Sequence, residues 1–378
     1  MTDNRISAST TLNDYLHARA SAHGTPLSGN FELTPCCNLH CRMCYVRREY
    51  SEVADRMIGG KQWIDWGREA TEKGMLYLLL TGGEPLTHPD FREIYTELHK
   101  LGLMIMLNTN GTLIDEDMVN FFAEKVPARV NLTLYGSSPE TYERLCGDGS
   151  AYERAVKAIC ALNDRGIQVK LNFSATPSNC DDFPEIMEFA AKRHIRVQTS
   201  AYMFPGIRRD REFENGDRFP PREAGALLAQ HDLLRFPREE FLARAEDMQN
   251  GRTLPDIQEC FDQPTEHLRC RAGRSSFWIT WDGLLAPCGM MTRPTANVRE
   301  IGLAQAWEEI RAKTAEILVP SQCTQCSIRS YCVSCPAACL AETGEFTAVP
   351  TYLCEMTQAY LENVRAKAEE LREENCEN

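Results

Sequence analysis

Three cysteines near the N-terminus have the spacing of a metal-binding loop. Cys37, Cys41 and Cys44 form a C-x3-C-x2-C motif just after the short apolar run 31–33. Three thiolates in one tight loop can bind three irons of a [4Fe–4S] cube and leave the fourth iron without a protein ligand. A small molecule can bind and react at such an open iron. The motif therefore predicts an iron–sulfur cluster that takes part in chemistry.

Two other uses of these thiols are less consistent with the sequence. A structural zinc site requires four closed ligands, and the additional donor His40 is held between Leu39 and Cys41. A disulfide framework is typical of short secreted chains, whereas this chain has 378 residues and its N-terminus lacks the apolar core of an export signal. No apolar run reaches the roughly 18 residues of a membrane span, so we expect a cytoplasmic protein that does not bind membranes.

The composition is that of a globular protein that is long enough to bury a large core. The sequence is 43% hydrophobic and 25% charged, and its net charge of −13 argues against binding to nucleic acid. Ten of the 17 cysteines lie from residue 260 onward. Cysteines used so heavily in a reducing compartment indicate metal ligation.

Apolar runs alternate with amphipathic segments between residues 31 and 202. This alternation indicates parallel βαβ units, and six of them without a dinucleotide-binding motif predict an α/β fold with a partial (β/α)6 barrel. The expected strands are residues 31–33, 75–81, 103–109, 130–135, 169–174 and 197–201, and the expected helices are 61–73, 91–101, 116–125, 139–165 and 183–193. The active site of such a barrel lies at the carboxyl ends of its strands.

The rest of the chain divides into segments before and after this barrel. We expect an N-terminal leader or cap over residues 1–30, a barrel over 31–202, and a linker over 203–259 with a helical pattern from Arg222 to Gln249. A small cysteine-rich domain with a C-terminal helix, residues 260–378, follows.

A second motif, Thr81-Gly82-Gly83-Glu84-Pro85, ends the second expected strand. Adjacent glycines let the backbone approach a ligand closely, and a carboxylate beside them can bind an ammonium group. By itself the motif is better explained as an ordinary turn between a strand and a helix. Its position beside the three cysteines favours a binding role.

The two motifs together resemble those of the radical S-adenosylmethionine (SAM) superfamily. In that family SAM binds the open iron, and an electron from the cluster cleaves it to methionine and a 5′-deoxyadenosyl radical. The resemblance implies that Gly82, Gly83 and Glu84 contact the methionine amino group of SAM. The residue before the last cysteine, usually aromatic in the family, is Met43 here, which is a soft apolar substitute.

Weaker signals lie at later strand ends. By the same resemblance Thr133 and Arg144 match positions that contact the ribose and carboxylate of SAM, and Asn172 is a candidate partner of the ribose. A turn or a helix cap explains each of these residues equally well.

The C-terminal cysteines form a second dense pattern. Residues 278–281 followed by Asp282-Gly283 predict a β-hairpin whose returning strand carries Cys288. Further on, the chain contains a C-x2-C-x5-C-x2-C-x3-C run. Two iron–sulfur clusters or two zinc sites are the serious explanations of so many close thiols.

This region resembles the SPASM domain, which carries two auxiliary [4Fe–4S] clusters beside the one that binds SAM. The resemblance implies that Cys270, Cys288 and Cys335 ligate the first auxiliary cluster and that Cys323, Cys326, Cys332 and Cys354 ligate the second. The interval after the third ligand of the run is x2 instead of the usual x3, and Cys339 is additional. Either Cys339 or Cys260 completes the first cluster, or its fourth iron is open for a substrate thiolate.

Enzymes with this two-part layout mostly modify peptides and proteins, so the resemblance implies a peptide or protein substrate and a reducing partner such as flavodoxin or ferredoxin. Our hypothesis is the oxidative maturation of a ribosomal peptide through a thioether or another crosslink. A sulfatase-type maturase is less consistent, because those enzymes carry an acidic base where this chain has Gly289. Oxidation of a small molecule or a tetrapyrrole stays open. A non-catalytic iron–sulfur electron carrier is the alternative from another class, and it would form no 5′-deoxyadenosine.

Overall fold

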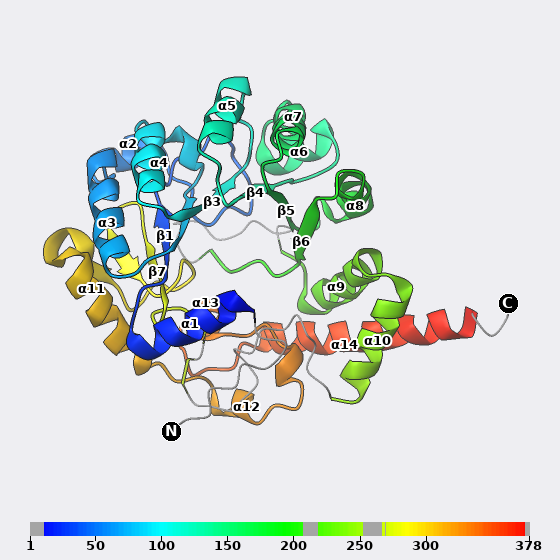
Figure 1. The fold of residues 1–378 in the computed structure, drawn as a ribbon. Coiled ribbons are helices and arrows are strands. Elements are labelled where there is room, and N and C mark those ends of the chain that lie inside the picture. The colour runs from blue at the N-terminus through cyan, green and yellow to red at the C-terminus, as the bar shows by residue number, and fades with distance from the viewer. Residues whose placement is uncertain (1–10, 207–217, 252–266, 269, 375–378) are drawn as a thin grey trace.

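One mixed sheet runs through the protein in this computed structural model, which describes residues 11–206, 218–251, 267–268 and 270–374. In the described part the sheet has nine strands in the order β6-β5-β4-β3-β2-β1-β7-β8-β9 (Figure 1). The strands are β1 Ser28–Glu32, β2 Tyr77–Thr81, β3 Met104–Thr109, β4 Arg129–Thr133, β5 Val169–Ser174, β6 Arg196–Ser200, β7 Ser276–Ile279, β8 Leu284–Ala286 and β9 Ala296–Asn297.

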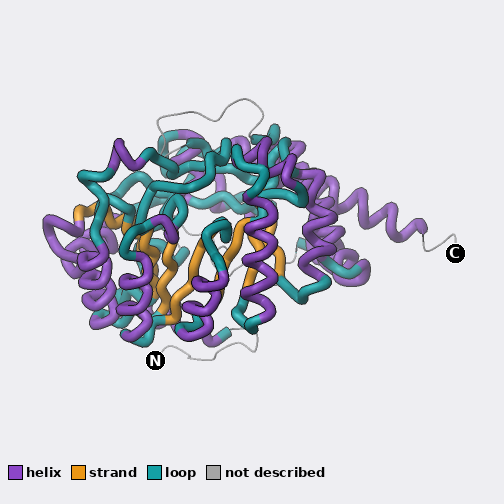
Figure 2. The backbone as a smooth tube through the Cα atoms, turned by 90° about the horizontal axis from the view of Figure 1, so that it is seen from above, coloured by secondary structure: helices purple, strands orange, loops and turns teal. Residues whose placement is uncertain are grey.

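Strands β1 to β6 are parallel neighbours, and helices cover the outside of their arc, as Figures 1 and 2 show. The predicted α/β fold with six parallel strands is therefore confirmed. The helices are α1 Leu12–His23, α2 Tyr50–Val53, α3 Gly60–Glu72, α4 Phe91–Lys100, α5 Glu116–Glu124, α6 Pro139–Cys146, α7 Ala151–Asp164, α8 Phe183–Ala191, α9 Pro221–Arg235, α10 Arg238–Gln249, α11 Val298–Ala315, α12 Ser321–Thr324, α13 Pro336–Thr343 and α14 Thr351–Glu374.

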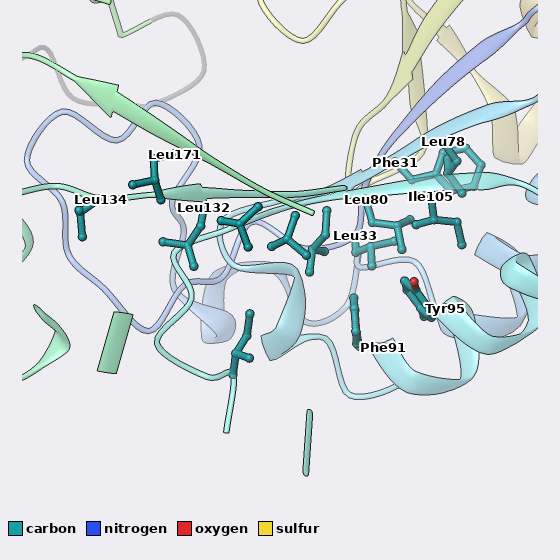
Figure 3. Close-up of a cluster of buried hydrophobic side chains, with 14 of the residues drawn as sticks. Phe31, Leu33, Leu78, Leu80, Phe91, Tyr95, Ile105, Leu132, Leu134 and Leu171 are labelled. Carbon is teal, nitrogen blue, oxygen red and sulfur yellow. The ribbon is translucent and has the colours of Figure 1, made fainter. Parts of the chain in front are cut away.

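The two faces of this arc differ in composition. Apolar side chains such as Leu80, Ile105 and Leu132 point from the strands toward the helices and are fully buried (Figure 3). Alternate residues of the same strands face the inside, because successive side chains of a strand point to opposite faces. Lys170, Asn172 and Ser174 of β5 are accordingly only half-buried.

Two expected helices are interrupted. The pattern over 139–165 folds into α6 and α7, because Gly147 adopts φ +71 and ends α6 in a left-handed cap. The pattern from Arg222 to Gln249 is broken between α9 and α10, where Pro237 lacks the N–H that a continuous helix needs. Our prediction of single helices was wrong at both places.

The C-terminal region extends the barrel sheet. The predicted hairpin is present, with β7 antiparallel to β8, but Cys288 lies two residues beyond β8 and not on it. Strand β7 also pairs in parallel with β1, which the sequence did not indicate. Residues far apart in the chain thus share one hydrogen-bonded scaffold.

Helix α1 contacts the start of this region. Its His17 forms a hydrogen bond with Ser275 Oγ at 2.9 Å, and Asp14 pairs with Arg271 at 2.7 Å. At the other end of the chain, α9 and α14 cross so closely that a Cβ on Gly225 would lie 2.2 Å from the carbonyl oxygen of Met356. None of the described helices combines the length and the apolar composition that crossing a bilayer requires.

Candidate active site

A cavity of about 350 Å³ opens at the carboxyl ends of the barrel strands. It is bounded by the loop after β1, the Gly-Gly turn after β2 and the ends of β3, β4 and β5. Its lining includes Cys37, Cys41, Cys44, Met43, Gly82, Gly83, Asn110, Thr133, Tyr135, Ser174, Tyr202, Met203, Phe204 and Met290. The cavity therefore lies where a β/α barrel carries its chemistry.

The three thiols of the C-x3-C-x2-C motif all face this cavity. They are close enough that Cys41 and Cys44 contribute, after burial and Glu84, to raising the pKa of Cys37 to about 12. The N–H of Leu39 and the side-chain amide of Asn110 lie 3.4 and 3.7 Å from Cys37 Sγ. Buried, mutually repelling thiolates with N–H donors nearby suit a positively charged iron centre, which removes the repulsion.

The arrangement does not suit a single metal ion. Among the described residues, no group of three or more His, Cys, Asp or Glu side chains converges on one ion. The C-x3-C-x2-C spacing instead fits a [4Fe–4S] cube bound by three thiolates. Cys37, Cys41 and Cys44 are thus the residues that would hold such a cluster.

The Gly-Gly turn packs against the backbone that leads into the cysteine loop. Gly83 N–H donates to Thr34 O at 2.7 Å, and Glu84 N–H donates to Cys36 O at 2.8 Å. A Cβ on Gly83 would lie 2.4 Å from Cys36 O and 2.7 Å from Pro35 O. Only glycine allows the loop and the turn to approach this closely, so both motifs are held in one unit.

Glu84 is completely buried behind the cavity lining. Its Oε1 accepts from Thr109 Oγ1 at 2.8 Å and from Leu86 N–H at 3.2 Å, and its Oε2 accepts from Asn110 N–H at 2.8 Å. Burial raises the pKa of Glu84 to about 7, although these hydrogen bonds oppose the rise. Glu84 thus lies behind the lining and not in it, and its contact with the ammonium group of SAM stays a prediction.

The three residues with weaker predicted SAM contacts lie in different places in the structure. Thr133 lines the cavity, as predicted for a SAM contact. Arg144 instead donates to Ser178 O at 2.7 Å, outside the cavity lining. Asn172 lines a second cavity further down the inner face of the sheet. The roles of all three residues stay predictions.

Comparison with protein families and known proteins identifies the chemistry. The radical SAM superfamily pattern matches residues 31–190, the stretch that contains the cysteine loop, the Gly-Gly turn and the barrel. The chain belongs to the radical SAM superfamily. It is a radical SAM enzyme, for which the family implies a [4Fe–4S] cluster and SAM.

Two curated relatives match over most of their length. The AdoMet-dependent heme synthase of Methanosarcina barkeri is 25% identical over 84% of this chain and 93% of its own length. The PqqA peptide cyclase of Rhizobium meliloti is 25% identical over 80% of this chain and 79% of its own length. They differ in what their names say they act on.

Solved structures share the fold over nearly the whole chain. Streptococcus suis SuiB bound to S-adenosylmethionine has a TM-score of 0.66 and 17% identity, and covers 90% of this chain and 81% of its own. AnSMEcpe with bound AdoMet has a TM-score of 0.67 and 16% identity, and covers 91% of this chain and 98% of its own. Both proteins have also been solved with peptides bound, SuiA and Cp18Cys respectively. The match extends beyond the barrel into the cysteine-rich region.

Two groups of thiols follow the radical SAM barrel. Burial and the neighbouring Cys332, Cys323 and Cys326 raise the pKa of Cys354, so these four lie together. Cys270, Cys288 and Cys335 pack against one small apolar cluster. The N–H groups of Met290 and Ser334 lie 3.3 and 3.4 Å from Cys288 Sγ and Cys332 Sγ, repeating the pattern at Cys37.

The sequence left open how the first auxiliary set is completed. Cys339 is buried, and burial, with smaller contributions from Cys323 and Cys335, raises its pKa to about 12, so it lies near a member of each set. Cys260 and Cys376 lie outside the described residues. The ligation of the auxiliary sets stays a prediction.

Several cavity residues were not predicted. Residues 202–204 and Met290 come from segments that follow the barrel, and Cys146 at the end of α6 contacts Cys41 from outside the lining. These contacts join distant parts of the chain, so no local pattern could reveal them. Asn110, directly after β3, joins Glu84, Asn38 and Cys37 in the same way.

Proposed function

We propose that this radical SAM enzyme oxidises a peptide substrate and forms a crosslink, such as a thioether, in a ribosomally made precursor. Loaded with its cluster and SAM, the site would supply a 5′-deoxyadenosyl radical that takes a hydrogen atom from the substrate. We further propose that the electron enters from flavodoxin or ferredoxin in the cytoplasm.

The observation that carries this proposal concerns the part of the cavity wall that comes from beyond the barrel. Met290, two residues after Cys288, and residues 202–204 complete the lining there. A substrate in the cavity would therefore contact the segment that carries Cys288, which supports a role for the C-terminal thiols. This position suits an oxidation, because an electron acceptor is needed beside the substrate once its hydrogen atom has left.

Crosslinking requires such an acceptor. A thioether replaces a C–H bond and an S–H bond by a C–S bond, so the substrate loses hydrogen atoms overall. One leaves as part of 5′-deoxyadenosine, and the electron of the other must pass to an oxidant. The Cys270, Cys288 and Cys335 set would hold an auxiliary [4Fe–4S] cluster that supplies this oxidant.

A sulfatase-type maturase fits the chain less well than its fold suggests. The position after Cys288 is Gly289, and a Cβ there would lie 2.9 Å from the indole ring of Trp278. An acidic side chain at this position would need the packed tryptophan to move. The site thus has no room for the base that such enzymes carry after the matching cysteine.

The test is an anaerobic assay of the reconstituted enzyme with SAM, a strong reductant and the precursor peptide encoded beside its gene. We expect 5′-deoxyadenosine, formed faster with the peptide, and a peptide mass lower by the lost hydrogen atoms. Equal 5′-deoxyadenosine formation with and without the peptide, together with an unchanged peptide mass, would refute the proposal.

A second candidate is oxidation of a tetrapyrrole. It is favoured by the match to the Methanosarcina barkeri heme synthase, which extends over 93% of that protein. The same assay with an iron porphyrin in place of the peptide separates the two candidates. A porphyrin product with lost mass, and no change in the peptide, would select this second function.

A further inference from the structure

A second cavity lies on the inner face of the barrel, below the one that faces the cysteines. Its volume is about 390 Å³, and the strands β1 to β6 line it. Asn108, Thr133 and Ser174 line both cavities, so the two spaces adjoin each other. A molecule that extends through the lower cavity therefore reaches the space where the radical forms.

Two cations face this lower cavity. Arg129 begins β4 and Lys170 is the second residue of β5, and both are half-buried. No aspartate or glutamate is among the described residues that line the cavity. The cavity floor is therefore positive, although the whole protein carries a net charge of −13.

The partners of the two cations are neutral. Arg129 Nε donates to Asn131 Oδ1 at 2.8 Å, and Lys170 Nζ donates to Gln198 Oε1 at 2.7 Å. Within the described chain neither forms an ion pair. A guanidinium has five N–H donors and an ammonium three, so most donors remain for a ligand.

The two cations repel each other in this setting. Burial, Arg129 and then Arg196 lower the pKa of Lys170 to about 8. Half-buried like charges without a counterion weaken a fold, so such an arrangement is typical of sites that await an anion. The side-chain amide of Asn172 also lines the cavity and can donate to an anion, whereas those of Asn30 and Asn131 donate to Phe277 O and Asn108 Oδ1.

We propose that this lower cavity binds a carboxylate group of the substrate, with Arg129 and Lys170 as its partners. The inference rests on the proposed function in one respect, namely that the substrate reacts in the upper cavity. Arg129 and Thr133 are four residues apart on β4, or about 13 Å at the usual rise of a strand. The carboxylate is thus carried on an arm that separates it from the reacting carbon.

Two kinds of substrate carry such an arm. One is a peptide with an acidic side chain or C-terminus, and the other is a tetrapyrrole with propionate side chains. Both present the same chemistry to Arg129 and Lys170. Probes of each kind, paired with neutral counterparts, distinguish the two sources.

The experiment measures binding to the reconstituted protein with SAM present but without reductant. The probes are glutarate against glutaramide, a glutamate peptide against its glutamine counterpart, and coproporphyrin III against its methyl ester. We expect at least one acid to bind about tenfold more tightly than its neutral counterpart, since hydrogen bonds to charged groups are worth that much or more. The pair that discriminates identifies the source of the carboxylate.

The variants Lys170→Met and Arg129→Gln test the residues themselves. Each substitution should weaken binding of the acidic probe by about tenfold and leave binding of the neutral probe unchanged. Lys157→Met is the matched control, because it removes an exposed lysine of the outer helix α7. The ligand-free melting temperature of Lys170→Met should equal or exceed that of the wild type, which shows that the variant folds.

The inference fails if no acid binds better than its neutral counterpart, or if both variants bind the acid as the wild type does. These outcomes differ from a failure of the proposed function. A wild-type enzyme that forms no 5′-deoxyadenosine under reduction would contradict the proposed function, whereas the binding measurements need no turnover.

Discussion

The outer and inner faces of the barrel sheet use the same strands for different purposes. On β5, Val169, Leu171 and Phe173 are buried against the helices, while Lys170 and Asn172 face the cavities. The outer face is closely packed and apolar, and the inner face is polar, half-open and positively charged. Residues that stabilise the fold and residues that line the cavities thus alternate along the same strand. Substitutions on the outer face should therefore change stability, and substitutions on the inner face should change binding or activity.

The largest effect is expected in the cysteine loop, at the carboxyl ends of the strands. Cys41→Ala removes a predicted ligand of the SAM-binding cluster, so 5′-deoxyadenosine formation should fall to background and bound iron should drop by about four per chain, from about twelve in the wild type. Iron analysis and an anaerobic cleavage assay measure both. Cys160→Ala, on the outer helix α7, should keep full iron content. Unchanged iron in Cys41→Ala would remove this residue from the ligand set.

On the outer face, Leu107→Ala should cost stability and spare chemistry. Leu107 is fully buried, so the cavity that it leaves should lower the free energy of unfolding by about 2–5 kcal/mol. Denaturant titration measures the loss, and SAM cleavage per folded molecule should stay near the wild-type rate. The exposed Leu113→Ala should change stability by less than about 0.5 kcal/mol. A stable but inactive Leu107→Ala would contradict the separation of the faces.

Gly83→Ala tests how closely the Gly-Gly turn must pack against the backbone that leads into the cysteine loop. The added methyl group meets the carbonyl oxygens of Pro35 and Cys36, which are backbone atoms that cannot rotate away. We expect SAM binding weakened by about tenfold or more, or about 1.4 kcal/mol. Equilibrium dialysis with labelled SAM is the measurement. Gly59→Ala is the control, since a Cβ there meets nothing within 4 Å.

The smallest effect concerns Lys170 and pH. Its pKa of about 8 in the folded protein lies below the ordinary 10.5, so the unfolded chain binds the proton more tightly. The wild type should therefore gain stability as pH rises from 8 to 10.5, whereas Lys170→Met should lack this gain. Melting temperatures across this range, with Lys157→Met as control, measure the difference. If the melting temperatures of the wild type and Lys170→Met change with pH in parallel, burial does not lower the pKa of Lys170.

Much of the difference between the two faces of the sheet could be predicted from the sequence. The alternation along β5 and the Cys37, Cys41 and Cys44 spacing are local patterns, and local patterns decide strands, loops and ligand sets. The breaks at Gly147 and Pro237 were equally local and were overlooked, because amphipathic periodicity continued across them.

The remaining features depend on contacts between distant segments. The pairing of β1 with β7, the contact of Cys146 with Cys41, and the meeting of Arg129 with Lys170 each join residues whose separation no periodicity encodes. The burial of Glu84 behind the cavity, where three donors hold its carboxylate, likewise required coordinates.

The parallel pairing of β1 with β7 also has a consequence for electron transfer. Ser28 to Phe31 run in register with Ser276 to Ile279, so the loop that follows β1 and the hairpin that leads to Cys288 grow from one backbone lattice. A hydrogen-bonded sheet restricts how far the segments that leave it can move relative to one another. If the C-terminal thiols bind clusters as we propose, the two cysteine-rich regions would keep one separation set by the sheet, without a domain motion between them.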